Sequence, residues 1–160
     1  IYNSDPAAQY TTWNDTNYIS PEIFTDGLQF IAKHHNHVVA VGNRSAEFFY
    51  DAQTEIGSPL ARQETYTQAV GCYPFITSYS RRYVQIGDDI FFPGVVSNGG
   101  ISIYRIKNFK VEQVSTPYVD DRINYGLADG VYSPLQAMKL YRRLVRVALC
   151  IVEPTHLTSI

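Results

Sequence analysis

The residues best suited to metal binding are the three histidines of the run His34-His35-Asn36-His37. On an extended strand, His35 and His37 would share one face, as a metal site could require. No Cys, Asp or Glu lies at a spacing typical of a metal ligand set with them. We therefore interpret the run as a polar turn between two strands, and we predict no metal site.

Two carboxylate pairs, Asp88-Asp89 and Asp120-Asp121, could serve hydrolysis or calcium binding. Gly87 precedes the first pair, which predicts a tight turn. The second pair follows Ser115-Thr116-Pro117, which predicts the first turn of a short helix. The sequence has no DxDxDG loop, GxSxG elbow, P-loop or GxGxxG motif. We predict no catalytic residues, no cofactor and no enzymatic activity.

Three arginines near the end of the chain, Arg142, Arg143 and Arg146, form a basic cluster. They follow Ser133-Pro134, a pairing typical of a helix start. Apolar residues then recur at helical spacing at Leu135, Met138, Tyr141, Val145, Ala148 and Val152. This pattern favours an amphipathic helix, and the alternative is a strand over Leu144–Val152. The arginines mostly lie off the apolar stripe, so they form either a solvated face or a contact surface for phosphate or an acidic partner.

The overall composition excludes some function classes. The chain has 160 residues, a net charge of −2 and 13 Tyr with a single Trp. The charge balance does not favour nucleic acid as a tightly bound partner, and no apolar run is long enough to span a membrane. Cys72 and Cys150 show no zinc spacing, and we expect two free thiols, although a disulfide between them is open. The chain begins at Ile1 and shows no signal peptide, so we expect a piece of a longer polypeptide or a processed product.

Alternating apolar residues and Gly/Asn/Asp turns predict an all-β antiparallel fold. The expected strands are Leu28–Lys33, His37–Val41, Ala46–Tyr50, Tyr83–Ile86, Ile90–Phe92, Ile101–Ile106 and Val111–Val114. Pro93-Gly94 is expected to end the fifth of these, and residues 52–66 to form a long excursion. The strands group into two propeller-like blades, about 27–51 and 80–115. Closure of a propeller needs about four blades, so the chain predicts a partial β-propeller.

The pattern divides the chain into three parts. Residues 1–26 are expected to be a loop segment in which Trp13 is a packing anchor. Residues 27–125 carry the blades, and residues 126–160 are a divergent C-terminal segment that is expected to be helical. The predicted core residues are Val39, Val41, Phe48, Phe91, Ile103 and Val114. The predicted exposed turn residues are Asn43, Asp88 and Asn98.

Several blocks, in order, resemble the tail hub or nozzle proteins of short-tailed bacteriophages, also called phage stabilisation proteins. The blocks are Asp5-Pro6 through Thr12-Trp13-Asn14, Val39–Tyr50, Gly57-Ser58-Pro59-Leu60-Ala61-Arg62, Val70-Gly71-Cys72, Ile86–Gly94, Gly100–Arg105, and Val114-Ser115-Thr116-Pro117 with Ile123. The resemblance covers residues 3–125, and residues 127–160 depart from the pattern.

The resemblance implies a propeller-like virion protein that retains packaged DNA and conducts it during ejection. It also implies self-association into a cyclic homo-oligomer, a hexamer, assembled in the host cytoplasm. Further implied partners are a portal–adaptor ring, distal tail proteins and, transiently, genomic DNA, with no membrane. The residues alone leave two other functions open. One is a carbohydrate-binding β-propeller, because exposed Tyr and Trp rings stack on sugars, and the other is a propeller glycosidase.

Overall fold

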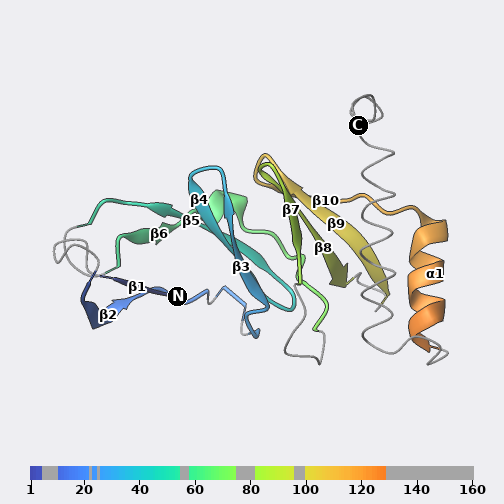
Figure 1. Ribbon diagram of the computed structural model, residues 1–160, viewed down its shortest axis with the longest axis horizontal. Helices are drawn as coiled ribbons and strands as arrows, with labels where there is room; N and C mark the ends of the chain where they lie inside the picture. Colours follow the sequence, from blue (N-terminus) through green and yellow to red (C-terminus); the bar gives the residue numbers. More distant parts are fainter. Residues whose placement is uncertain are drawn as a thin grey trace, which may run out of the picture.

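The computed structural model describes residues 1–4, 11–21, 23–24, 26–54, 58–74, 82–95 and 100–128. Within these residues the chain forms two four-stranded antiparallel sheets, preceded by a two-stranded ribbon and followed by an α-helix (Figure 1). The all-β prediction is therefore confirmed. Each four-stranded sheet is a simple meander, which is the arrangement of a propeller blade.

The first blade contains four strands in chain order: β3 (Phe30–His34), β4 (His37–Val41), β5 (Ala46–Asp51) and β6 (Leu60–Arg62). The strands β3 to β5 match the predicted ones closely. The expected excursion over residues 52–66 is wrong in part, because it contains β6 and the short 3-10 helix η2 (Glu64–Tyr66). Strand β6 pairs with β5 through Phe49 and Arg62, and so completes the blade.

The second blade contains β7 (Val84–Ile86), β8 (Asp89–Val95), β9 (Ile101–Lys107) and β10 (Lys110–Gln113). The prediction that Pro93 ends β8 is wrong, since Pro93 pairs with Ile103 within the sheet. The carbonyl of Pro93 accepts a hydrogen bond from the Tyr73 N–H at 2.8 Å, on the side away from β9. The N–H that proline lacks would point to the same side, so no bond to β9 is lost.

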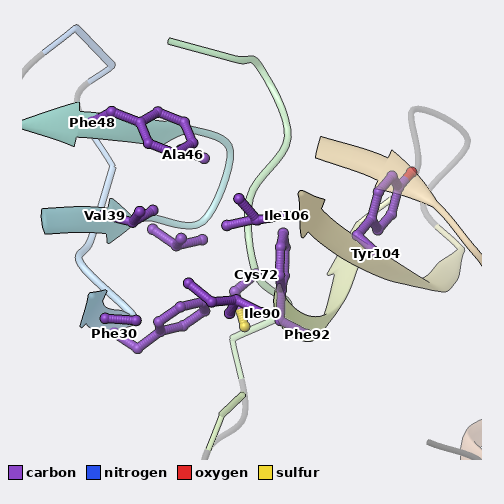
Figure 2. Packing of buried hydrophobic residues seen from close by; sticks show 11 residues of the cluster. Phe30, Val39, Ala46, Phe48, Cys72, Ile90, Phe92, Tyr104 and Ile106 are labelled. Atoms are coloured by element: carbon purple, nitrogen blue, oxygen red, sulfur yellow. The ribbon is translucent and has the colours of Figure 1, made fainter. Parts of the chain in front are cut away.

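The core lies between the two blades, which pack face to face (Figure 2). Val39 pairs with Ala32 and Phe48, so these three residues lie on one face of the first blade. Phe30 meets Phe92 of the second blade edge to face, with ring centroids 5.7 Å apart. The buried members of this cluster are Phe30, Ala32, Val39, Val41, Ala46, Phe48, Cys72, Ile90, Phe92, Tyr104 and Ile106.

A short connecting segment around Cys72 joins the blades through its backbone. The Cys72 N–H donates to the Gly42 carbonyl of the first blade at 2.8 Å, and the Gly71 carbonyl accepts from Val95 of the second at 3.3 Å. A Cβ on Gly71 would collide with the backbone of Asn43. Only glycine therefore allows this close approach.

The remaining elements lie on opposite sides of the blade pair. The helix α1 (Pro117–Ala128) packs on the outer face of the second blade, where Ile123 contacts Ile103 (Figure 1). At the other end, β1 (Tyr2–Ser4) and β2 (Trp13–Tyr18) form the ribbon. The expected N-terminal loop with a packing anchor is wrong in part, because Tyr2–Ser4 and Trp13–Tyr18 form strands and Trp13 is 65% exposed.

Most of the predicted core is confirmed. Five of the expected residues are buried: Val39, Val41, Phe48, Phe91 and Ile103. Val114 is only half-buried, because it lies past the end of β10, and Asn43 is half-buried rather than exposed because its side chain accepts a hydrogen bond from Gln29. Asp88 is exposed as expected. Asn98, Cys150, the helix expected after Ser133-Pro134 and its strand alternative lie outside the described residues.

Candidate functional site

The histidine run forms the turn between β3 and β4, as predicted, but its first residue is not part of a polar tip. His34 is fully buried, with no exposed side-chain surface. Its Nδ1 lies 2.6 Å from the Asp88 carbonyl oxygen, and its Nε2 accepts a hydrogen bond from the Phe109 N–H at 3.2 Å. Asp88 and Phe109 each belong to a turn of the second blade. His34 therefore links the blades.

His35 and His37 do not share a strand face, because His35 lies in the turn, with φ of 52°. The His35 Nδ1 is 3.2 Å from an Asp88 carboxylate oxygen. His37 is the pairing partner of His34 and packs edge to face on Phe109. Among the described residues, no group of three or more His, Cys, Asp or Glu side chains is placed to hold a metal ion.

Burial dominates the electrostatics of these histidines. It lowers the pKa of His34 below the usual 6.5, and nearby His35 lowers it further, while the Asp88 carbonyl and the charges of Asp88 and Asp89 raise it. The pKa of His37 is also lowered, by burial and then by His35. Both residues therefore favour the neutral form in the folded protein.

The two aspartate pairs lie on different elements and make structural contacts. Asp88 lies in the turn after Gly87, which has φ of 58°, and Asp89 lies 3.8 Å from Arg105. Asp120 lies in the first turn of α1, as predicted, and accepts a hydrogen bond from the Gln113 side chain at 2.8 Å. Asp121 is exposed on the same helix. These contacts give each pair a role in a turn or a helix start.

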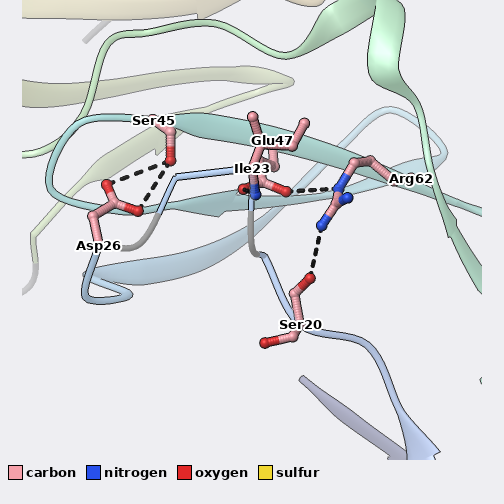
Figure 3. A network of polar contacts seen from close by, with 6 residues as sticks. All are labelled: Ser20, Ile23, Asp26, Ser45, Glu47 and Arg62. Carbon is pink, nitrogen blue, oxygen red and sulfur yellow. Dashed lines mark hydrogen bonds and ion pairs between the residues drawn. The ribbon is translucent and has the colours of Figure 1, made fainter.

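A second polar site holds Ser20, Pro21, Ile23, Phe24 and Asp26 against the outer face of the first blade; we call these residues the strap (Figure 3). At its centre is Glu47, whose side chain is fully buried. Its Oε2 accepts from the Arg62 Nε at 2.8 Å, and its Oε1 accepts from the Ile23 N–H at 3.2 Å. Arg62 also donates to the Ser20 carbonyl at 2.8 Å. The ion pair thus binds the backbone of the strap at two points.

The far end of the strap is fixed by a carboxylate. Asp26 accepts a hydrogen bond from the backbone N–H of Arg44 and lies 3.3 Å from the Ser45 hydroxyl, which donates to it. Both partners belong to the turn between β4 and β5. The Val39–Tyr50 stretch therefore does more than form two strands, since Ser45 and Glu47 hold the strap in place.

In the part of the chain that the structure describes, several large apolar or aromatic side chains are exposed on the first blade's side, on the ribbon and on α1. On the first blade's side, the strap exposes Ile23 at 42% and Phe24 at 37%, and the outer face of the blade exposes Ile31 at 40%. The ribbon and α1 expose mostly aromatic rings. These are Tyr2, Trp13, Tyr18, Tyr118 and Tyr125. Such surfaces mark candidate contacts with other chains or ligands.

The candidate partner contacts Arg142, Arg143 and Arg146 lie outside the described residues, so their placement stays a prediction. No helix within the described residues is long and apolar enough to cross a membrane.

A comparison with family models decides the affiliation. Residues 8–141 match the phage stabilisation family, described as bacteriophage P22 Gp10, beta-propeller. The chain belongs to this family. The family is one of phage structural tail proteins, which makes this chain a virion component and agrees with the two stacked blades. The match also runs past residue 125, where the motif resemblance ended. No curated protein matches the chain.

The burial of His34 and Glu47 is not predicted by the sequence pattern that we used. His34 continues the alternation of Phe30 and Ala32, and this period of two was the available signal for its burial. Glu47 sits between apolar neighbours, but its partner Arg62 lies on a strand that the sequence pattern did not predict.

Proposed function

We propose that the chain is part of the tail hub or nozzle, the tube that retains packaged DNA in a short-tailed phage and conducts it during ejection. The observation that carries the proposal is the family match over both blades. The near-neutral charge of the chain supports it, because a strongly basic wall would bind the phosphates of passing DNA and slow its movement. The contact with DNA is transient and non-specific.

The proposed partners are further copies of the chain, in a cyclic homo-oligomer and most simply a hexamer, together with a portal–adaptor ring and distal tail proteins. Two blades cannot close a propeller, so their outer surfaces need cover. The apolar side chains exposed at the strap and on the first blade support such an assembly, as does the basic cluster Arg142, Arg143 and Arg146. This structural role includes no catalysis.

The test is the assembly state of the full-length protein. Mass photometry should show a ring-sized species that binds a purified portal–adaptor complex. Reversal of Arg142, Arg143 and Arg146 to Glu should weaken that binding. Reversal of Lys107 and Lys110, which are exposed in the second blade, is the matched control and should leave it unchanged. A protein that stays monomeric at high concentration and ignores the portal–adaptor complex would contradict the proposal.

A second candidate function is glycan binding, and the N-terminal ribbon favours it. Tyr2 and Trp13 are each 65% exposed, and Tyr18 is 54% exposed, with its ring 5.6 Å from that of Tyr2. Exposed aromatic faces of this kind stack on sugar rings. Trp13 is the single Trp, so its fluorescence reports on the ribbon alone. A saturable shift of the Trp13 emission on titration with host-surface glycans would support glycan binding, and an unchanged emission spectrum would contradict it.

A further inference from the structure

We propose that His34 is a proton-sensitive lock between the two blades, closed when its imidazole is neutral and opened when a second proton binds. Its two ring nitrogens contact the backbone of two different turns, at Asp88 and Phe109. Both turns belong to the second blade, while His34 ends β3 of the first. A single buried side chain thus bridges the junction at two points.

The partners of His34 settle its tautomer. The Phe109 N–H can only donate, so Nε2 must carry a lone pair. The proton of the neutral ring is therefore on Nδ1, where it donates to the Asp88 carbonyl, which can only accept. A second proton would go to Nε2, directly opposite the Phe109 N–H. Two hydrogens would then face each other, and the bond to Phe109 could not persist.

The Phe109 turn depends on the first blade for its shape. Phe109 and Asn108 have φ of 62° and 48°, in the left-handed region that bulky residues such as Phe rarely adopt. The Phe109 N–H is bound by His34, and its carbonyl accepts from the Gln68 side chain at 3.0 Å. Protonation of His34 would remove one of these two supports. We expect the turn between β9 and β10 to move away from the first blade first.

The surrounding charges compensate a protonated His34 only in part, and burial outweighs them. On its own turn, His35 approaches as a potential like charge, and His37 pairs with it from β4. From the second blade, Asp88 and Asp89 are the facing carboxylates. Their side chains already pair with His35 and Arg105, respectively. The other turn is flanked by Lys107 and Lys110, which add no negative charge.

The direction of the pH effect follows from this burial. The pKa of His34 is lower in the folded protein than the 6.5 expected of the unfolded chain. Between these two values the unfolded state binds more protons, so stability falls as the pH drops. The contribution of the neutral lock is complete above pH 6.5 and is lost as the pH falls through the folded-state pKa. The lowered pKa of His37 makes stability depend on pH in the same direction.

The test follows the lock directly in the intact chain. Nuclear magnetic resonance of the imidazole nitrogens should show the Nδ1–H tautomer at pH 7.5 and a pKa below 6.5 for His34. Between pH 6.5 and that lower pKa, the protection of the Phe109 amide against hydrogen exchange should fall by up to about tenfold per pH unit as the pH drops. Core amides such as that of Val39 should lose less of their protection against hydrogen exchange over the same pH range. An Nε2–H tautomer, or a His34 titration that leaves Phe109 protected, would overturn the proposal.

Two glutamine variants separate the lock from its neighbours. His34→Gln can still donate to Asp88 and accept from Phe109 but cannot titrate, so the pH dependence of Phe109 protection should disappear. His35→Gln is the matched control, since it removes the neighbouring partly exposed histidine and should leave that dependence in place. Equal pH dependence in His34→Gln and the parent would refute the lock. If His34→Gln does not fold, the titration of the parent protein still decides.

Discussion

The clearest stability prediction concerns Arg62→Met, which removes the partner of a buried charge. Met keeps much of the apolar stem of Arg62 but lacks the guanidinium, whose carbon lies 5.8 Å from the centroid of the Phe49 ring. It does not keep the bonds to Glu47 and to the Ser20 carbonyl. Of the hydrogen bonds to the Glu47 carboxylate described above, only the one from the Ile23 N–H would remain. The change therefore isolates the charge pairing more than the packing.

The expected loss of unfolding free energy is large because the charged group of Glu47 has no contact with solvent. The Glu47 side chain is 0% exposed and the Arg62 side chain 25%. Breaking such a pair from one side typically costs about 3–5 kcal/mol, since an uncompensated charge stays buried. We place Arg62→Met toward the lower end of that range, because Arg62 itself is partly in water. Urea denaturation followed by circular dichroism measures the difference, and hydrogen exchange at the Ile23 amide should show the strap loosening.

The second blade supplies a matched control. Arg105 pairs with Glu112 across neighbouring strands, as Arg62 pairs with Glu47, but the Glu112 side chain is 48% exposed. Arg105→Met should therefore cost under about 1 kcal/mol. The double variant Glu47→Leu with Arg62→Met should recover part of the loss, because no buried charge remains. Equal losses for Arg62→Met and Arg105→Met would refute the reasoning.

Three further predictions concern the core and the junction. Phe48→Ala should cost about 3–5 kcal/mol in urea denaturation, since Phe48 is fully buried between the blades, and a loss under about 1 kcal/mol would place it outside the core. Gly71→Ala should cost at least about 1–3 kcal/mol, because its Cβ would displace the backbone of residues 43–44, and an unchanged midpoint would contradict that close approach. Burial raises the pKa of Cys72 to about 12, so in a Cys150→Ser background its thiol should resist alkylation at pH 8 until denaturant is added, and rapid native-state labelling would contradict its burial.

The strands of the first blade were predictable where the apolar alternation is long enough. Val39 and Val41 alternate along β4, and the turn before Ala46 allows the pairing with β5. The strand propensity of these residues, their apolar alternation and the type of turn between them all favour the same hairpin, so the local sequence and the tertiary fold agree. Strand β6 has only three residues and pairs over Leu60–Arg62, so it is too short to show a pattern.

The N-terminal errors have a different cause. The ribbon residues are mostly polar or aromatic, and all but one residue of β2 are exposed. Sequence patterns identify strands by the residues that one face buries, so an exposed ribbon lacks that signal. Trp13 is expected from the sequence to be a packing anchor, although large aromatic residues also mark contact surfaces. Nothing in the local sequence separates these two roles.

The polar sites could not be predicted because their partners are distant along the chain. His34 meets Asp88 and Phe109, which lie 54 and 75 residues away. A charged or polar side chain in a strand is ordinarily predicted to be exposed. When such a side chain is buried, its hydrogen-bond partner often lies on another element, and only the tertiary structure shows which one. The local sequence could therefore indicate the turn but not the lock.

The two ends of the blade pair are covered in different ways, and this difference bears on assembly. At the second blade, α1 covers the outer face with apolar contacts, as between Ile123 and Ile103. At the first blade, the strap covers a buried ion pair and turns Ile23 and Phe24 outward. A neighbour that packs on the outer face of the first blade would meet these side chains before it could reach Glu47. The strap thus converts a charged face into a partly apolar one, which is the kind of surface that the proposed ring requires.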